Sequence, residues 1–270
     1  MSFVEQLFGL HGKTAFVTGG GSGIGTMIAH GLAHAGATVY IASRKLAACE
    51  QAAESINDEG PQGRVVAFEA DFSTEAGVNA AVEALNQHTD QLHILVNNAG
   101  RSWGMPYGQF PHDAWGKVFD LNVAGMFHLT QLLTDKLSNS ATEHDPARVV
   151  NVGSVMGSQP VAEGAYSYSA SKAAVHHMTR ILAREQAHRN ITFNALAPGP
   201  FPSKMTKAFV GDQQGAARIA AKNPFGRLGT AEDIAGCTLF LCSRAGAYTS
   251  GAIIPVDGGL NVSVGDIMFE

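Results

Sequence analysis

Three residues in the segment from Ala165 to Arg189 have types and spacing that suit proton transfer: Tyr168, Ser171 and Lys172. Apolar residues recur in this segment at intervals of three and four, which predicts a helix with one buried face. Residues four apart on a helix are neighbours, so the Tyr168 phenol and the Lys172 ammonium are expected to lie close together. An ammonium favours the phenolate, and moving the phenol pKa from ~10 to ~7 takes roughly 4 kcal/mol. The pair therefore predicts general acid–base chemistry.

Tyr166 is a competing phenol two residues earlier. Position 170, four residues further on, is alanine, so this phenol lacks a lysine partner and we expect Tyr168 to be the acid. Tyrosine and lysine also fall at this spacing by chance, and a pair on the protein surface is the alternative. Residues elsewhere in the chain must decide between the two.

Two further polar residues fit the same chemistry. Ser154 follows the predicted strand Arg148–Val152, where its hydroxyl could hold a substrate oxygen for the phenol. Asn122 falls on the apolar stripe of a helix predicted over His112–Leu137. An unpaired buried amide costs roughly 1–3 kcal/mol, so it should have a partner. That partner is either a structural hydrogen bond or a water that connects the Asn122 side chain to Lys172.

The segment Thr18–Gly25 has the pattern T-G-x-x-x-G-x-G, with Gly19, Gly23 and Gly25 at the fixed positions. It lies between a predicted strand, Thr14–Thr18, and a predicted helix that begins near Ile24. Glycines allow a tight turn and a close approach of the backbone to a pyrophosphate, which then sits at the helix N-terminus. The pattern predicts a dinucleotide site; a glycine-rich loop without a ligand is the alternative.

The residues after the second predicted strand, Thr38–Ala42, bear on the cofactor. An acid there would bond the ribose 2′-hydroxyl of NAD, but this strand ends in Ser43, Arg44 and Lys45. A phosphate monoester pairs well with a guanidinium. We therefore predict a preference for NADP(H) over NAD(H), with Arg44 as the main discriminator and Ser43 assisting. In the alternative, Arg44 points into solvent.

Short β-branched and apolar runs alternate with helical patterns along the whole chain, which predicts an α/β fold with a doubly wound parallel sheet of about seven strands and helices on both faces. No repeat, linker or low-complexity segment marks a boundary, so we expect one domain over 1–270. Its cofactor half is expected over 12–150 and its catalytic half over 151–270. The remaining strands are predicted over Arg64–Phe68, His93–Val96, Ile191–Leu196 and Ile253–Val256, and further helices over Lys45–Asp58 and Thr74–His88.

Composition excludes several classes of function. The chain of 270 residues is 45% hydrophobic and carries a net charge of −5, whereas a nucleic-acid binder needs a basic face. The three cysteines form no C-x-x-C pair, which is typical of a reducing cytoplasm. No signal peptide is evident, and no apolar run approaches the ~20 residues that span a bilayer. We expect a soluble cytoplasmic protein with no nucleic-acid or membrane partner.

Two histidine pairs invite a metal-site interpretation. His30 and His34 lie four apart on a predicted helix, and His176 and His177 are adjacent. Because no cluster of Cys, Asp or Glu accompanies either pair in the sequence, we expect solvated surface histidines and no metal.

Taken in order, the glycine pattern, Asn97–Gly100, Asn122, Ser154 and the Tyr168/Lys172 pair resemble the short-chain dehydrogenase/reductase family over nearly the whole chain. The resemblance implies a Rossmann-like fold, Tyr168 as general acid, Ser154 and Asn122 assisting, Lys172 on the nicotinamide ribose, and a homotetramer or homodimer with helices 112–137 and 165–189 at an interface. The implied pyrophosphate residues are Gly19, Ser22, Gly23, Ile24 and Gly25. The other implied cofactor residues are Asp71, Phe72, Asn98, Ala99, Gly100, Pro198, Gly199, Phe201 and Ser203.

Three shorter segments, 101–104, 201–206 and 246–251, are similar to those of β-ketoacyl reductases in this family. That similarity implies reduction of a 3-oxoacyl or similarly apolar ketone. Two alternatives stay open: a sugar-acid or polyol dehydrogenase, and a cofactor-binding sensor without turnover. We expect a lid over 201–222. The candidate pocket residues are apolar: Trp103, Met105, Val155, Met156, Phe201 and Met205.

Overall fold

Seven parallel strands form a single sheet in the order β3-β2-β1-β4-β5-β6-β7 in the computed structural model, which describes residues 2–202 and 213–263. The strand order reverses between β1 and β4, because β2 pairs with one side of β1 and β4 with the other. In open α/β sheets this is the place where ligands bind, at the carboxyl ends of the strands. The strands are β1 (Thr14–Thr18), β2 (Thr38–Ser43), β3 (Arg64–Glu69), β4 (Ile94–Asn97), β5 (Ala147–Val152), β6 (Ile191–Pro198) and β7 (Ile253–Val256).

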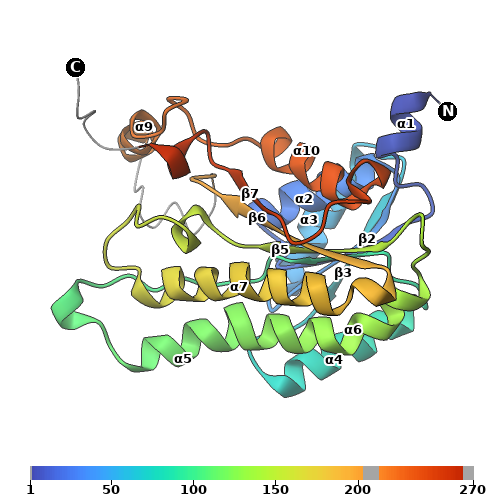
Figure 1. Ribbon diagram of the computed structural model, residues 1–270, viewed down its shortest axis with the longest axis horizontal. Helices are drawn as coiled ribbons and strands as arrows, with labels where there is room; N and C mark the ends of the chain where they lie inside the picture. Colours follow the sequence, from blue (N-terminus) through green and yellow to red (C-terminus); the bar gives the residue numbers. More distant parts are fainter. Residues whose placement is uncertain (1, 203–212, 264–270) are drawn as a thin grey trace.

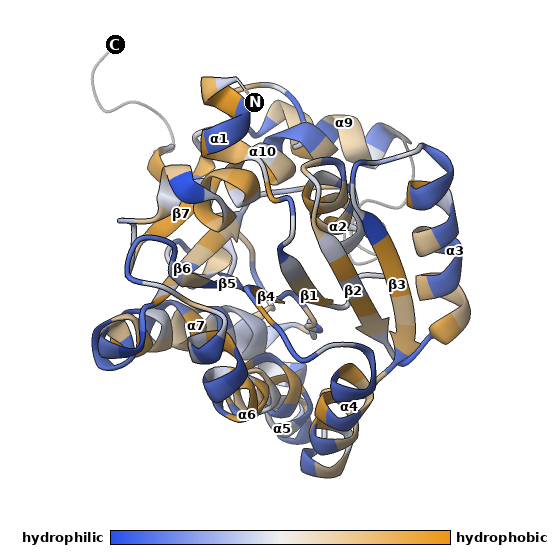
Figure 2. Ribbon diagram, turned by 90° about the vertical axis from the view of Figure 1, so that its right-hand side faces the viewer, coloured by the Kyte–Doolittle hydropathy of each residue, from blue (hydrophilic) through white to orange (hydrophobic). Residues whose placement is uncertain are grey.

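Helices cover both faces of the sheet (Figure 1). Helices α4, α5, α6 and α7 lie together on one side, and α2 and α10 lie on the other (Figure 2). The described helices are α1 (Phe3–Phe8), α2 (Ile24–His34), α3 (Leu46–Asp58), α4 (Glu75–His88), α5 (Asp113–Phe119), α6 (Met126–Asn139), α7 (Tyr166–Glu185), α9 (Gln213–Ala221) and α10 (Ala231–Cys242).

The core is divided by the sheet into two apolar clusters. On one face, Ile28 of α2, Ile56 of α3 and Ile234 of α10 pack against the strands. On the other face, Leu85 of α4 and Leu133 of α6 belong to the second cluster. Strands β1, β4, β5 and β6 are buried along their whole length, as expected for parallel strands covered on both sides. This packing fixes the strand ends from which the functional loops emerge.

The predicted fold class and all seven predicted strands are confirmed. The helix predicted over His112–Leu137 is present but contains a π-helical turn, Asp120–Gly125, between α5 and α6. The helix predicted over 165–189 is α7 followed by a short 3-10 turn, Ala187–Arg189. The sequence analysis did not predict α1, α9 and α10. Among the helices that the structure describes, none has both the length and the apolar character needed to cross a bilayer.

Candidate active site

A cavity of about 450 Å³ lies at the carboxyl edge of the sheet, where the strand order reverses. Loops that follow successive strands form its walls, together with the first turns of α7. Most of the cofactor residues predicted from the sequence line it: Gly19, Ser22, Gly23, Ile24, Ser43, Arg44, Asp71, Phe72, Asn98, Ala99, Gly100, Tyr168, Lys172, Pro198, Gly199 and Phe201. Ser154 lines it as well.

The phenol and the ammonium of α7 lie side by side in this cavity. The Lys172 Nζ atom is 5.6 Å from the centre of the Tyr168 ring and donates a hydrogen bond of 2.6 Å to the carbonyl oxygen of Val152. Ser154 follows β5 directly, and its hydroxyl hydrogen-bonds with Tyr168 and accepts from the backbone N–H of Met156. The spacing predicted from the sequence thus brings the phenol, the ammonium and the hydroxyl together.

Burial is the main influence on the ionisation of Tyr168. Burial raises the pKa of Tyr168 above its ordinary value of 10, and the hydrogen bond with Ser154 opposes this only in part. The physical reason is that a phenolate loses its hydration when it is buried. At neutral pH Tyr168 is a protonated acid, which is the form that reduction of a carbonyl requires.

The same burial acts on Lys172 in the opposite direction. It lowers the pKa of the ammonium from 10.5 to about 8, because the charged form loses its hydration. The bond to the Val152 carbonyl oxygen replaces part of that hydration. The side chain therefore still carries its charge at neutral pH.

Asn122 lies on the π-helical turn between α5 and α6, and its side chain is 2% exposed. Its Oδ1 accepts from the backbone N–H of Arg101 at 2.9 Å, and its Nδ2 donates to the Arg101 carbonyl oxygen and to Ser171 Oγ, both at 3.0 Å. Ser171 in turn donates to the backbone oxygen of Tyr168. These contacts match the structural alternative stated above, and Asn122 does not line the cavity.

The glycine loop is held in place by Asn98, which follows β4. The Asn98 side chain donates to the carbonyl oxygens of Thr18 and Gly19, at 2.9 and 3.2 Å. Gly19 and Gly23 adopt positive φ values of 68° and 58°, which side chains rarely tolerate. Gly25 lies outside the cavity lining. A Cβ there would stand 2.4 Å from the Gly19 carbonyl oxygen, so this glycine is required for close packing.

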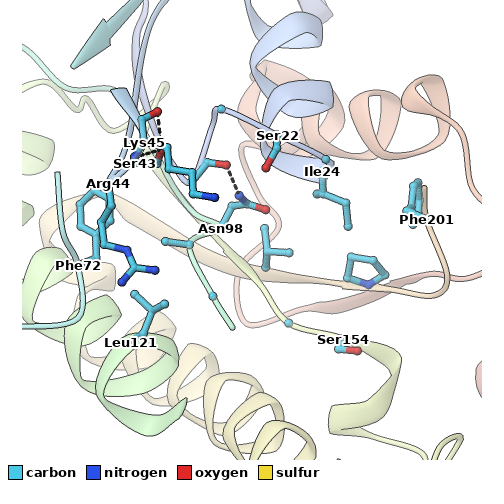
Figure 3. A pocket seen from close by; sticks show the side chains of 18 of the residues that line it. Ser22, Ile24, Ser43, Arg44, Lys45, Phe72, Asn98, Leu121, Ser154 and Phe201 are labelled. Atoms are coloured by element: carbon cyan, nitrogen blue, oxygen red, sulfur yellow. Dashed lines mark hydrogen bonds between the residues drawn. The ribbon is translucent and has the colours of Figure 1, made fainter. Parts of the chain in front are cut away.

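Arg44 lies at the far end of the cavity from Ser154, close to Phe72 and Leu121 (Figure 3). Ser43 accepts a hydrogen bond from the backbone N–H of Lys45 and contacts the Cys49 sulfur at 3.1 Å, so its hydroxyl organises the turn that presents Arg44.

The Asp71 carboxylate interacts electrostatically with Arg44 and Arg101. Burial acts to raise its pKa, but hydrogen bonds from Ser73 and the charges of Arg44 and Arg101 outweigh this and lower the pKa below its ordinary value. This end of the cavity therefore holds an ionised carboxylate whose position is fixed by Ser73, and an exposed guanidinium.

Comparison with known proteins places this geometry in a family. A family model described as "Enoyl-(Acyl carrier protein) reductase" matches residues 19–261. A rhamnolipids biosynthesis 3-oxoacyl-[acyl-carrier-protein] reductase of Pseudomonas aeruginosa is 44% identical, over 96% of this chain and 100% of the relative. The chain belongs to the short-chain dehydrogenase/reductase family. It is accordingly an oxidoreductase that acts on CH–OH groups.

Two further matches show the breadth of this family. A 5-keto-D-gluconate 5-reductase of Escherichia coli is 34% identical, over 97% of this chain and 100% of the relative. The solved Pseudomonas aeruginosa RhlG/NADP active-site complex superimposes with a TM-score of 0.90 at 43% identity, covering 95% of this chain and 99% of that one. The short-chain dehydrogenase/reductase fold is therefore shared by relatives named for acyl and for sugar-acid substrates.

Several residues that line the cavity were not predicted from the sequence. Lys45 was noted there only as a second cation, yet it lines the cavity beside Arg44. Its position directly after Arg44 was a signal that could have found it. The others contribute backbone or small apolar surface, for which the sequence carries no chemical signal: Gly21, Ala48, Ala70, Leu121, Val152 and Gly153.

Among the predicted substrate residues that the structure describes, Phe201 lines the cavity, whereas Trp103, Met105, Val155 and Met156 do not. Val155 and Phe201 are buried, Trp103 and Met156 are half-buried, and Met105 is 37% exposed. Met205, Ser203 and the central part of the predicted lid lie outside the described residues; the described end of that segment contains α9.

The histidine expectations need two corrections. His176 is 4% exposed rather than solvated, and it contacts Ser158 Oγ through Nδ1 at 3.2 Å. His30 and His34 are near the surface, but a carboxylate does accompany them: Glu59 lies within hydrogen-bond distance of both rings. It is distant in sequence, which is why inspection of the local sequence overlooked it.

Proposed function

We propose that this protein is an NADP(H)-dependent carbonyl reductase that converts an apolar ketone, a 3-oxoacyl compound or a similar one, into its alcohol. The observation that carries the proposal is the arrangement of one cavity: Tyr168, Ser154 and Lys172 meet at one end, and Arg44 stands at the other. Such a cavity accommodates an extended dinucleotide with its reactive ring beside the phenol.

The bound nicotinamide cofactor supplies the hydride. Tyr168, which burial keeps protonated, gives its phenolic proton to the carbonyl oxygen as that oxygen gains charge. The Ser154 hydroxyl donates a hydrogen bond to the same oxygen and stabilises it. The Lys172 ammonium lies beside the ring and favours the phenolate that remains, until solvent returns a proton. Asn122 and Ser171 hold the first turn of α7 and so keep the phenol in position.

The cofactor preference rests on charge. Arg44 and Lys45 both line the cavity, and they bring two cations to the place where a 2′-phosphate would lie. Asp71 is the acid nearby, and its carboxylate oxygen already accepts two hydrogen bonds from Ser73. The NADP complex of the similar Pseudomonas aeruginosa structure supports the same choice.

The substrate class rests on apolar residues near the reacting end of the cavity, which favour an acyl chain over a polyol. Phe201 lines the cavity, and Val155 and Met156 directly follow Ser154 in the chain. The relative named as a 3-oxoacyl-[acyl-carrier-protein] reductase supports this class. A second candidate is reduction of a keto sugar acid, which the relative named as a 5-keto-D-gluconate 5-reductase favours. A family-model description alone favours enoyl reduction, in which the proton acceptor is a carbon rather than an oxygen held by Tyr168 and Ser154.

The test is NADPH oxidation by the purified protein with a 3-oxoacyl thioester, an aromatic ketone, 5-keto-D-gluconate and an enoyl thioester. We expect turnover of the first two, and at least a 100-fold loss of kcat in Tyr168→Phe, since general acid catalysis contributes about 10²–10⁴-fold. Tyr166→Phe is the matched control, because that phenol packs edge-on against Phe110 and belongs to no catalytic contact. Activity confined to the sugar acid or the enoyl thioester would overturn the substrate class, and an active Tyr168→Phe would overturn the mechanism.

We infer that copies of the chain associate through α5, α6 and α7, into a homotetramer or homodimer in the cytoplasm. Four large apolar side chains on these helices support this: Trp115, Phe127, Leu132 and Ile181 are each 39–43% exposed. Light scattering coupled to size exclusion, with Ile181→Glu against the unchanged protein, measures it. A monomeric unchanged protein would contradict the inference.

A further inference from the structure

Away from the active site, two imidazoles and a carboxylate converge at one place near the surface. The Nε2 atoms of His30 and His34 lie 2.7 and 3.0 Å from the same oxygen, Oε2 of Glu59. The two imidazole rings are neighbours, with centroids 4.3 Å apart. Among the residues that the structure describes, this is a group whose candidate ligand atoms all lie within 4.8 Å of one another. The three side chains are thus aimed at a common point.

The backbone holds these side chains in place. His30 and His34 are one turn apart on α2, so they project from the same side of that helix. Glu59 is the residue immediately after α3. The loop that Glu59 begins is hydrogen-bonded to the end of α2, because the N–H of Gly63 donates to the carbonyl oxygen of Ala33 at 2.9 Å. Ligands that stand on anchored elements are partly preorganised for an ion.

We propose that His30, His34 and Glu59 bind one divalent transition-metal ion, for which Zn²⁺ is the best match. Bonds of about 2.0–2.2 Å in a tetrahedral site separate two ligand atoms by roughly 3.3 Å. The observed separations between the histidine nitrogens and the carboxylate oxygen are 2.7 and 3.0 Å, so they need to open by about 0.6 and 0.3 Å. Imidazole and carboxylate together suit Zn²⁺, Ni²⁺ or Cu²⁺, whereas Mg²⁺ prefers a shell of oxygens.

The surrounding charges favour a cation at this site. The Glu59 carboxylate supplies a negative charge within the ligand set itself. Both histidines lie in the C-terminal half of α2, where the helix dipole favours positive charge. Glu232, at the start of α10, interacts electrostatically with His30 and adds negative charge beside the ligand set.

The ion would join two elements of the cofactor half. Helix α2 begins at Ile24, on the wall of the cavity, and His30 lies about 9 Å further along its axis. The site therefore does not touch the reacting atoms, and the part assigned to it is structural: it fastens α2 to the connection between α3 and β3. An ion that binds the folded chain and not the unfolded chain stabilises the folded state by mass action.

Tag-free protein, stripped with a chelator and dialysed, tests the proposal. The readouts are Zn²⁺ titration by calorimetry, the visible absorption of the Co²⁺ complex, and the melting temperature with and without Zn²⁺. We expect one ion per chain, Co²⁺ bands of a tetrahedral site, and a higher melting temperature with Zn²⁺. His34→Gln and Glu59→Gln should each weaken Zn²⁺ binding at least tenfold. His188→Gln is the matched control, since His188 is exposed and bonds only a nearby backbone oxygen.

Each outcome decides the matter. Equal affinity in His34→Gln and in the unchanged protein would overturn the site, as would binding lost equally in His188→Gln. One ion for every two chains would place the ligands between copies and overturn the intramolecular arrangement. Zn²⁺ binding that leaves the melting temperature unchanged would overturn the structural part of the proposal. Because none of these readouts uses catalysis, failure here is distinguishable from failure of the proposed activity.

Discussion

The buried Lys172 charge should lower the stability of the folded protein, and replacing it with methionine should recover part of that loss. Burial shifts the lysine pKa from 10.5 to about 8. At about 1.36 kcal/mol per pKa unit, holding the ammonium in the folded protein costs about 3 kcal/mol at pH 7. Between these two pKa values the unfolded chain binds more protons than the folded one, so stability rises with pH. By pH 9 the cost has fallen to about 2 kcal/mol.

Lys172→Met removes this cost but also the hydrogen bond of 2.6 Å to the Val152 carbonyl oxygen. An unsatisfied buried carbonyl costs about 1–3 kcal/mol. The two effects leave the variant between unchanged and about 2 kcal/mol more stable than the unchanged protein at pH 7. Activity should be lost, because the ammonium no longer assists the phenol.

Urea unfolding at pH 7 and pH 9 measures the prediction, with Lys117→Met as the control because Lys117 is exposed. The unchanged protein and the control should share one pH dependence. Lys172→Met should lack about 1 kcal/mol of the rise in the free energy of unfolding between the two pH values. An identical rise in Lys172→Met and in the unchanged protein would refute the reasoning, because it would mean that the lysine has the same pKa folded and unfolded.

Three further changes test other parts of the site. Arg44→Ala should lower kcat/KM for NADPH about 10–100-fold and leave kcat/KM for NADH nearly unchanged, because a charge-assisted hydrogen bond contributes about 1.5–3 kcal/mol. An unchanged ratio of the two kcat/KM values would mean that the guanidinium points into solvent. Gly25→Ala should lower the melting temperature and raise the cofactor KM, because its Cβ meets the Gly19 oxygen at 2.4 Å. Burial first, then the charges of Lys172 and Arg180, lower the pKa of His176 to about 4, so stability should fall as the pH drops from 6.5 towards 4; an equally steep fall in His176→Leu would contradict this.

The sheet and the Tyr168/Lys172 pair could be predicted because both follow from the spacing of residues that are close in the sequence. Tyr168 and Lys172 meet through the geometry of a single helix, and β1 is a short run of β-branched and apolar residues that is buried along its length. The order of motifs along the chain also placed Ser154 and Arg44 correctly at the carboxyl edge, since parallel strands bring their ends to one side of the sheet. Local pattern and topology together predicted most of the residues that line the cavity.

Properties that depend on contacts between distant segments could not be predicted. The raised pKa of Tyr168 follows from burial, which sequence spacing does not measure. The role of Gly25 depends on Asn98, which bonds the glycine loop from 79 residues away. The carboxylate beside His34 comes from Glu59, 25 residues further along the chain. In each case the deciding neighbour belongs to a different element of the fold.

The two ends of the cavity hold their positive charges under different physical conditions, and this bears on which of them can change. Arg44 and Lys45 are exposed, so their charges cost the fold little and their loss alters only the affinity for an anion. Lys172 is buried beside a phenol whose pKa is raised by the same burial. We therefore expect one surface substitution to be enough to shift the cofactor preference, whereas a change at Lys172 should alter activity and stability together.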